Sequence, residues 1–231
     1  MIPVFINVFN RLSTTVALAE QVSKLAHAVP ILIDNNSDYE PLVDWYSRCE
    51  YEVVLLGENI GHHAPWRRVI PHDSSEFEGR YGTTRYVVTD CDLDISECPE
   101  DTLEVIEEPF FWREGIVKSG LSLRIDDLPE WQKNVIEWES RWWKKPTADG
   151  RFFIAPIDTT FAMYDCRTSV KKATSVVGVP AVRSAPPYVA RHIPWYLNGE
   201  NLDEENRNYF RTAGRSNSWK PDGKGLRSPY S

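Results

Sequence analysis

Short apolar runs alternate with segments of helical periodicity in the amino-terminal half of the chain, and this alternation constrains the fold more than any other feature. The apolar runs predict four strands, over residues 2–8, 30–34, 51–56 and 85–89. Apolar residues at helical spacing predict helices between the first three of these strands, over residues 14–28 and 41–48. This pattern is typical of a parallel sheet with crossover helices, so we expect all four strands in one α/β sheet.

The carboxyl-terminal half is less regular. Its pattern predicts a strand over residues 116–125, an aromatic amphipathic helix over 130–143 and a strand over 152–157, which makes the sheet mixed rather than purely parallel. From residue 211 onward the chain is rich in Gly, Ser, Pro and Arg and carries five basic residues against one acidic residue. We therefore expect one domain over residues 1–210 and a basic, loosely ordered tail over 211–231.

The charge, the cysteines and the hydropathy exclude several classes of protein. A formal net charge of −8 argues against a non-specific grip on nucleic acid, which needs a basic surface. The four cysteines show neither a CxxC pair nor a Cys/His pairing of zinc type, so we expect reduced thiols. No apolar stretch approaches the roughly 18 residues of a membrane span, and the first residues lack the basic flank of a signal peptide. We therefore expect a cytoplasmic protein without a membrane span.

A carboxylate cluster follows the fourth predicted strand, in the run Asp90-Cys91-Asp92-Leu93-Asp94. Side chains two residues apart on an extended backbone face the same side, so Asp90 and Asp92 can reach one ion or its water shell. Ligands of α/β sheets bind outside the carboxyl ends of the strands. Because Mg²⁺ and Mn²⁺ bind through one or two carboxylates plus substrate phosphates, we expect such a cation here beside a nucleotide diphosphate. The alternative is a turn held by Asx-type hydrogen bonds.

The order of several short motifs resembles the GT-A glycosyltransferases, and among them the small family-2-like bacterial and viral enzymes. The motifs cover about residues 2–210, and they are Ile33-Asp34-Asn35-Asn36-Ser37, Asn59-Ile60-Gly61-His62, Thr89-Asp90-Cys91-Asp92, Ile125-Asp126-Asp127-Leu128-Pro129, Trp138-Glu139, Ile157-Asp158-Thr159-Thr160-Phe161-Ala162 and Arg191-His192-Ile193-Pro194-Trp195-Tyr196. The resemblance implies a GT-A mixed sheet flanked by helices. It also implies transfer of a sugar, a hexose in the usual case, from a UDP-sugar or related donor to a glycan or other hydroxyl acceptor.

The resemblance also implies roles for particular residues around the donor. Asp34 corresponds to the acidic residue that accepts a hydrogen bond from the nucleobase, and its alternative role is a helix N-cap. The region of Asn10 and Arg11 resembles the nucleotide pocket, although Arg11 could equally be a surface arginine. Gly61 and His62 would lie near the donor, and an ordinary loop histidine is the alternative for His62. Asp90 would reach the ribose, a metal-bound water or the ion, and His192 would join Asp90 and Asp92 at the metal.

The catalytic base is open between two carboxylates. An inverting transfer needs a carboxylate on the acceptor side, and the resemblance points to Glu137 or Glu139. Asp158 is a second candidate, because it follows directly on the predicted strand over residues 152–157. Between Glu139 and Asp158, the family order slightly favours Glu139. The alternatives are a solvated helix face for Glu139 and a cap bonded to Thr160 for Asp158. The usual family-2 Glu-Asp dipeptide is missing, so a retaining reaction without a protein base also stays open.

Two other functions share parts of this pattern. Nucleotidyltransferases use the same topology and metal chemistry, but they usually carry a Gly-rich basic loop after the first strand, where this chain has Phe9-Asn10-Arg11-Leu12-Ser13. A non-catalytic binder of nucleotides or sugars would use the aromatic surface for binding and the carboxylates only to hold an ion. Transfer or donor hydrolysis that is lost on removing Asp92 would separate an enzyme from a binder.

Overall fold

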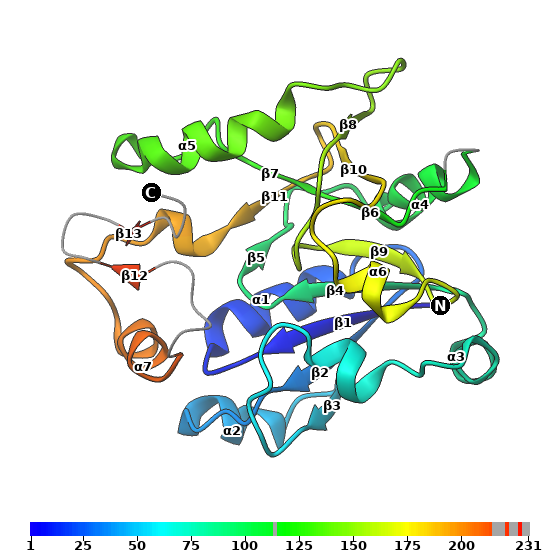
Figure 1. Cartoon of the computed structure of the whole chain (residues 1–231). Helices are drawn as coiled ribbons and strands as arrows, with labels where there is room; N and C mark the ends of the chain where they lie inside the picture. The colour runs from blue at the N-terminus through cyan, green and yellow to red at the C-terminus, as the bar shows by residue number, and fades with distance from the viewer. Residues whose placement is uncertain (113–114, 214–219, 222–225, 228–231) are drawn as a thin grey trace.

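The computed structural model describes residues 1–112, 115–213, 220–221 and 226–227. Its largest element is an eight-stranded mixed sheet (Figure 1). The strand order is β3 (Glu52–Leu55), β2 (Ala28–Asp34), β1 (Ile2–Val8), β4 (Arg85–Asp90), β9 (Ala162–Asp165), β6 (Lys118–Gly120), β10 (Ala181–Ser184) and β8 (Phe152–Ile154). The first four are mutually parallel, whereas β9 and β8 are antiparallel to their neighbours. The predicted α/β class, with a mixed sheet flanked by helices, and the predicted grouping of the first four strands are confirmed.

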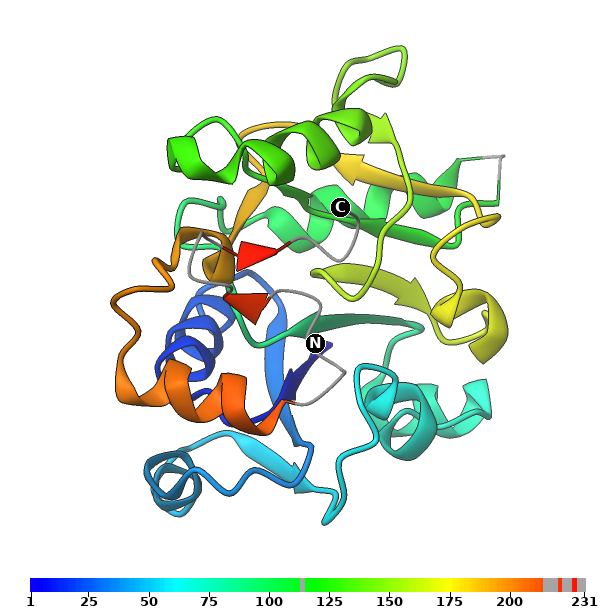
Figure 2. The ribbon, with the colours of Figure 1, turned by 60° about the vertical axis from the view of Figure 1, so that its left-hand side comes forward.

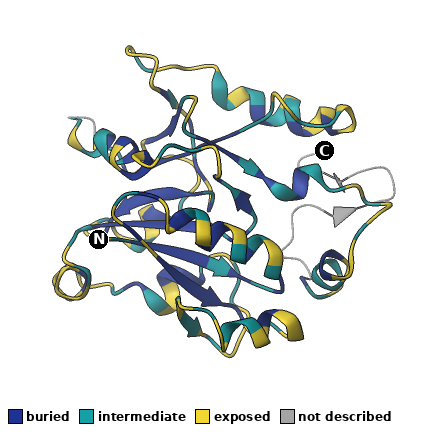
Figure 3. Cartoon of the chain, turned by 180° about the vertical axis from the view of Figure 1, so that it is seen from behind, coloured by how far each residue is buried: buried dark blue, intermediate teal, exposed yellow. Residues whose placement is uncertain are grey.

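Alternating side chains of β1 pack on opposite faces of this sheet. Val4, Ile6 and Val8 belong to one core with residues of α1 (Leu12–Val22), α2 (Glu40–Tyr46) and α4 (Thr102–Glu107). Phe5 belongs to a second core with residues of α3 (Ser74–Tyr81) and α6 (Val170–Thr174). Figure 3 shows the strands largely buried and the outer faces of the helices exposed. Helices therefore cover both faces, which leaves the strand ends as the place for a site.

A second, three-stranded sheet begins where β4 ends. It has the order β5 (Leu93–Asp94), β11 (Val189–His192) and β7 (Ser122–Leu123). Strand β5 is antiparallel to β11, with His192 opposite Leu93. The chain therefore passes from β4 of the main sheet directly into β5, and the pairing of β5 with β11 brings residues 191–192 beside residues 93–94.

The helix α7 (Glu204–Thr212) is tied to the loop that follows β1. The Asn10 side-chain amide donates to Thr212 Oγ1 at 2.9 Å, and the Ser13 hydroxyl donates to Glu205 Oε1 at 2.8 Å. Asp203 caps the helix by accepting from the Asn206 N–H at 2.7 Å. In Figure 2, α7 lies beside α1, so the last described helix closes over the first loop of the sheet.

The second half of the chain departs most from the sequence expectations. The predicted strand over residues 116–125 is two strands, β6 and β7, in different sheets. At the last residue of β6 the chain passes very close to the segment before β9, since an added Cβ at Gly120 would lie 2.5 Å from the Phe161 carbonyl oxygen. The predicted helix over residues 130–143 is η3 (Glu130–Gln132), α5 (Lys133–Glu139) and η4 (Ser140–Trp143). The aromatic pattern therefore predicts a helical segment at the right place, but it does not predict that the segment divides into an α-helix flanked by two 3₁₀ turns.

Other boundaries also differ. Helix α1 ends at Val22, earlier than predicted, because Ala28 already pairs in β2. Arg211 and Thr212, predicted as the start of the tail, belong to α7, and β12 (Lys220–Pro221) pairs with β13 (Leu226–Arg227). Ala213 is the C-cap of α7, and the other residues of the predicted tail lie outside the described residues. The remaining short elements are η1 (Pro65–Val69), η2 (Glu108–Phe111) and η5 (Ile193–Tyr196).

All four cysteines are free thiols, as predicted. Within the described part of the chain, every helix falls short of the length and apolarity that crossing a bilayer requires.

Candidate active site at the carboxyl end of the sheet

A cavity of about 420 Å³ opens at the carboxyl ends of β1, β2 and β4. Eight of the ten residues predicted from the sequence line it: Arg11, Gly61, His62, Asp90, Asp92, Glu139, Asp158 and His192. Asn10 and Asp34 are not among the lining residues. The cavity therefore joins residues from both halves of the chain at the edge where α/β proteins bind ligands.

Asp92 is the meeting point of the charged residues in this cavity. Its Oδ1 lies 3.6 Å from His192 Nε2, and its Oδ2 lies 3.8 Å from Arg11 Nε. The pairing of β5 with β11 explains the first contact, because the Ile193 N–H also donates to the Asp92 carbonyl at 2.9 Å. The predicted approach of His192 to Asp92 is therefore built into the backbone ladder.

Asp90 is held by a neighbouring threonine. Thr159 Oγ1 donates to Asp90 Oδ2 at 2.6 Å, and the Asp90 N–H donates to the Thr159 carbonyl at 3.0 Å. Burial raises the pKa of Asp90 well above its usual range, and the neighbouring charge of Asp92 adds to this rise, while the Thr159 bond opposes it. Because the charges of the two carboxylates repel each other, a cation beside them would be favourable.

His192 and Asp92 both have buried polar atoms without a hydrogen-bond partner in the described structure. These atoms are His192 Nδ1 and Asp92 Oδ1. Burial lowers the pKa of His192, so its imidazole is neutral and can act as a ligand. Within the described ranges, however, no three His, Cys, Asp or Glu side chains are grouped closely enough to hold a metal ion. A cation bound here would need further ligands from a substrate or from water.

Arg11 is a buried residue and not a surface arginine. Its Nη1 donates to Asn206 Oδ1 at 3.1 Å, and its guanidinium carbon lies 3.7 Å from the centre of the Tyr209 ring. Both partners belong to α7, so this helix orients the guanidinium toward Asp92. Neither Asn206 nor Tyr209 was predicted, because nothing in the local sequence marks α7 as part of a site.

Asn10 and Asp34 have local hydrogen-bond partners instead of facing the cavity. The Asn10 side chain accepts from the Asp38 and Tyr39 N–H groups, and the Asp34 carboxylate accepts from the Ser37 N–H at 2.8 Å. Burial raises the pKa of Asp34, and the bonds from Ser37 oppose this rise. The cavity is lined instead by the next residue, Asn35. Alternation along an extended chain could have indicated Asn35, but only with the exact register of the strand end.

The opposite wall comes from α5, η4 and β10. Glu139 is 3% exposed and pairs with the guanidinium of Arg183, so it does not lie on a solvated helix face. Burial raises the pKa of Glu139, and the charge of Arg183 opposes this rise. Arg183 also donates through Nε to the Pro156 carbonyl at 2.7 Å. Asp158, the other candidate base, is exposed at the cavity surface.

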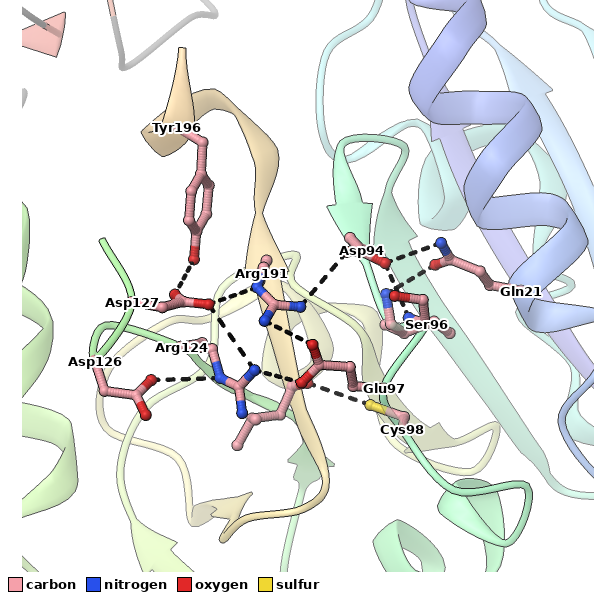
Figure 4. Close-up of polar contacts among 12 residues, drawn as sticks. Gln21, Asp94, Ser96, Glu97, Cys98, Arg124, Asp126, Asp127, Arg191 and Tyr196 are labelled. Carbon is pink, nitrogen blue, oxygen red and sulfur yellow. Dashed lines mark hydrogen bonds and ion pairs between the residues drawn. The ribbon is translucent and has the colours of Figure 1, made fainter. Parts of the chain in front are cut away.

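An ionic network holds the strand that carries His192 (Figure 4). Arg191 donates to Asp127 Oδ2 and to Glu97 Oε1, each at 2.7 Å, and lies 3.8 Å from Asp94 Oδ2. Tyr196 Oη donates to Asp127 Oδ1 at 2.6 Å. Successive residues of a strand face opposite ways, so Arg191 anchors the outer side of β11 while His192 faces the cavity.

The fold and site together define a mixed α/β protein with a charged cavity at the carboxyl edge of its sheet. No known family model matches the chain, and no curated protein matches its sequence. Among solved structures, the crystal structure of S. aureus TarS is similar over 91% of this chain, with 10% sequence identity and a TM-score of 0.48. The chain spans 38% of the length of that TarS chain. A likeness this distant defines neither a family nor an activity.

Proposed function

We propose that this protein is a glycosyltransferase that moves a sugar from a nucleotide diphosphate donor, a UDP-sugar, to a hydroxyl acceptor with the help of a divalent cation. One observation carries the proposal: Asp92, His192 and Arg11 meet in a cavity at the carboxyl end of β4. Such a group can bind a cation and a phosphate side by side, since the carboxylate and imidazole suit a metal and the guanidinium suits phosphate oxygens.

In this proposal Asp92 and His192 would hold Mn²⁺ or Mg²⁺, with Asp90 acting through the ribose, a metal-bound water or the ion itself. The buried Asp92 Oδ1, which lacks a hydrogen-bond partner in the described structure and lies 3.6 Å from His192 Nε2, supports this choice, because such an oxygen is costly unless a ligand or water satisfies it. The cation would neutralise the negative charge that develops on the departing nucleotide diphosphate.

Residues beside the metal position would orient the donor. Arg11 would face the diphosphate, and Gly61, His62 and Asn35 line the cavity where the nucleoside would lie. Asp34 remains the proposed acceptor for the uracil imide N–H, although its carboxylate also accepts from the Ser37 N–H. Asn35 is the alternative for this contact, since its amide offers both a donor and an acceptor.

The base would come from the wall across the cavity. Glu139 is favoured, because burial raises its pKa and thus its basicity, while the Arg183 ion pair holds its carboxylate in one place. Its role is to take the proton of the acceptor hydroxyl as the sugar leaves the diphosphate. Asp158 is the alternative, and a retaining reaction in which the donor phosphate takes the proton would replace both.

A thermal-shift screen of nucleotide-sugars tests the proposal directly. Each donor is measured with and without Mn²⁺, followed by assays of donor hydrolysis and transfer. A true donor at a hundredfold excess over its Kd should add about 2.7 kcal/mol to the free energy of unfolding. Asp34→Ala should weaken this effect for UDP-sugars. Equal affinity for UDP and GDP would contradict the choice of uridine, and no binding of any nucleotide-sugar would contradict the whole proposal.

A further inference from the structure

Two indoles stand on the wall of the cavity that the donor residues do not occupy. Trp138 near the end of α5 and Trp142 in η4 both line the cavity, and their ring centres lie 6.3 Å apart at an interplanar angle of 81°. Both side chains are only partly buried. Indoles of this size are usually covered by packing, so a partly buried Trp142 that lines the cavity offers one apolar ring face to a ligand, with Trp138 packed edge-on beside it.

Charged and polar groups surround this aromatic surface. The Arg183 guanidinium carbon lies 5.9 Å from the centre of the Trp142 ring and is paired with Glu139. The Arg141 guanidinium carbon lies 3.7 Å from the centre of the Trp138 ring. A carboxylate beside a guanidinium offers both acceptors and donors, while the indole offers an apolar face. This combination suits a ligand that is apolar on its ring faces and rich in hydroxyls at its edge.

We propose that Trp138 and Trp142, with the Glu139–Arg183 pair, form an acceptor subsite for a neutral saccharide ring. The inference rests on the proposed function and deepens it, because it replaces an unspecified hydroxyl acceptor by a carbohydrate. A pyranose ring packs its C–H groups against the indole of Trp142 and directs its hydroxyls toward Glu139 and Arg183. One of these hydroxyls is then placed beside the carboxylate that takes its proton.

The charges of the cavity favour a neutral saccharide over other acceptors. Arg183 is already paired with Glu139, so the charge of its guanidinium is balanced and offers little attraction to an anionic acceptor. Asp158 and the Asp90–Asp92 pair line the same cavity and would repel one. A purely apolar acceptor, such as a lipid chain, would bury these charges without hydrogen bonds, which is costly.

The test measures saccharide and nucleotide binding separately. Wild-type protein with Mn²⁺ and UDP is titrated with five neutral disaccharides, namely maltose, cellobiose, lactose, chitobiose and mannobiose, by saturation-transfer NMR and calorimetry. Octanol serves as the apolar probe. The same titrations are made with Trp142→Ala, Trp142→Phe and Trp131→Ala. Trp131 is the matched control, because it is 54% exposed and lies outside the lining of the cavity.

We expect at least one disaccharide to bind. Trp142→Ala should weaken that binding about tenfold, Trp142→Phe should weaken it less, and Trp131→Ala should leave it unchanged. The affinity for UDP with Mn²⁺ should be equal in all four proteins, which also shows that the variants are folded.

Several results would overturn the inference. UDP binding without binding of any disaccharide would remove the saccharide subsite and leave the proposed function standing. Equal losses in Trp142→Ala and Trp131→Ala, or a preference for octanol over every disaccharide, would remove it as well. Disaccharide binding without any nucleotide binding would instead overturn the proposed function, and with it the role of this surface as an acceptor subsite.

Discussion

The two walls of the cavity differ in how completely their charged and polar side chains are paired. On the wall formed by β1, β4 and β11, the charges of Arg11 and Asp92 lie 3.8 Å apart, and buried polar atoms lack hydrogen-bond partners within the described residues. On the wall formed by α5, η4 and β10, Glu139 and Arg183 already satisfy each other. The comparison teaches that the first wall is suited to a charged ligand, which would satisfy its unpaired polar atoms, whereas the charges of the second wall are already balanced and are suited to a neutral ligand.

The largest expected effect is on the first wall. Asp92→Asn keeps the shape of the side chain but removes its charge, so Mn²⁺ should be held far more loosely. Because a metal contributes several kcal/mol at the transition state, turnover should fall about 10³-fold. Turnover is measured against Mn²⁺ concentration, with circular dichroism as the control for folding. An unchanged Mn²⁺ dependence would refute the assignment and, with it, the contrast between the two walls.

The second largest effect is expected on the opposite wall, where variants of Glu139 and Asp158 test which carboxylate is the general base. Glu139→Gln should lower kcat at least about 10²-fold while donor affinity survives, as expected for loss of a general base. Asp158→Asn is the matched carboxylate variant on the exposed side of the same cavity, and it should keep most of its turnover. Transfer rate and donor binding are measured for both. If both variants keep near-normal turnover, a retaining mechanism without a protein base becomes the better account.

A smaller effect should follow from loosening the strand that carries His192. Arg191→Gln removes the ties to Asp127 and Glu97, so His192 should be oriented less well and Mn²⁺ affinity should fall about tenfold. Arg124→Gln is the control, since Arg124 pairs with the same Glu97 but does not lie on β11. Calorimetric Mn²⁺ titration of both variants checks this. Equal affinity in the two would show that Arg191 only stabilises the fold.

The smallest effect is a shift in the pH profile. Burial raises the pKa of Glu139, and a general base must be deprotonated to act. The acid limb of the kcat profile should therefore lie above the pKa of an ordinary glutamate, and kcat should fall as the pH drops through the raised pKa of Glu139. Arg183→Gln removes the charge that opposes the rise, so the pKa of Glu139 should rise further and the limb should move to higher pH. Profiles of kcat for wild type and variant measure this shift. A limb that stays in place would mean that Glu139 does not control the reaction.

The two walls also differ in how far the sequence predicts them. Asp90 and Asp92 follow a strand with a strong apolar pattern, so both their identity and their place at the sheet edge can be predicted. Arg183 and Trp142 cannot be found in this way, since β10 has four residues and η4 breaks a predicted helix. Their position depends on contacts between distant segments, which leave no local pattern.

Register explains the other limits of prediction. The choice between Asp34 and Asn35 as the residue that lines the cavity depends on a single step along the chain, and such a step reverses the side to which a side chain points. The association of His192 with Asp92 was expected from the resemblance alone, because the two-residue strand β5 is too short to be recognised from its sequence.

The fastening of α7 to the first loop has a consequence for how the protein folds. Arg11 reaches Asn206, a partner 195 positions further along the chain, and Asn10 reaches Thr212 across 202 positions. Contacts between such distant positions form slowly, because closing the long loop between them costs conformational entropy. During synthesis, the contacts of Arg11 with Asn206 and Tyr209 can therefore form only after α7 has left the ribosome. The sheet can assemble earlier, but the ability to bind a donor should arise late and in a single step.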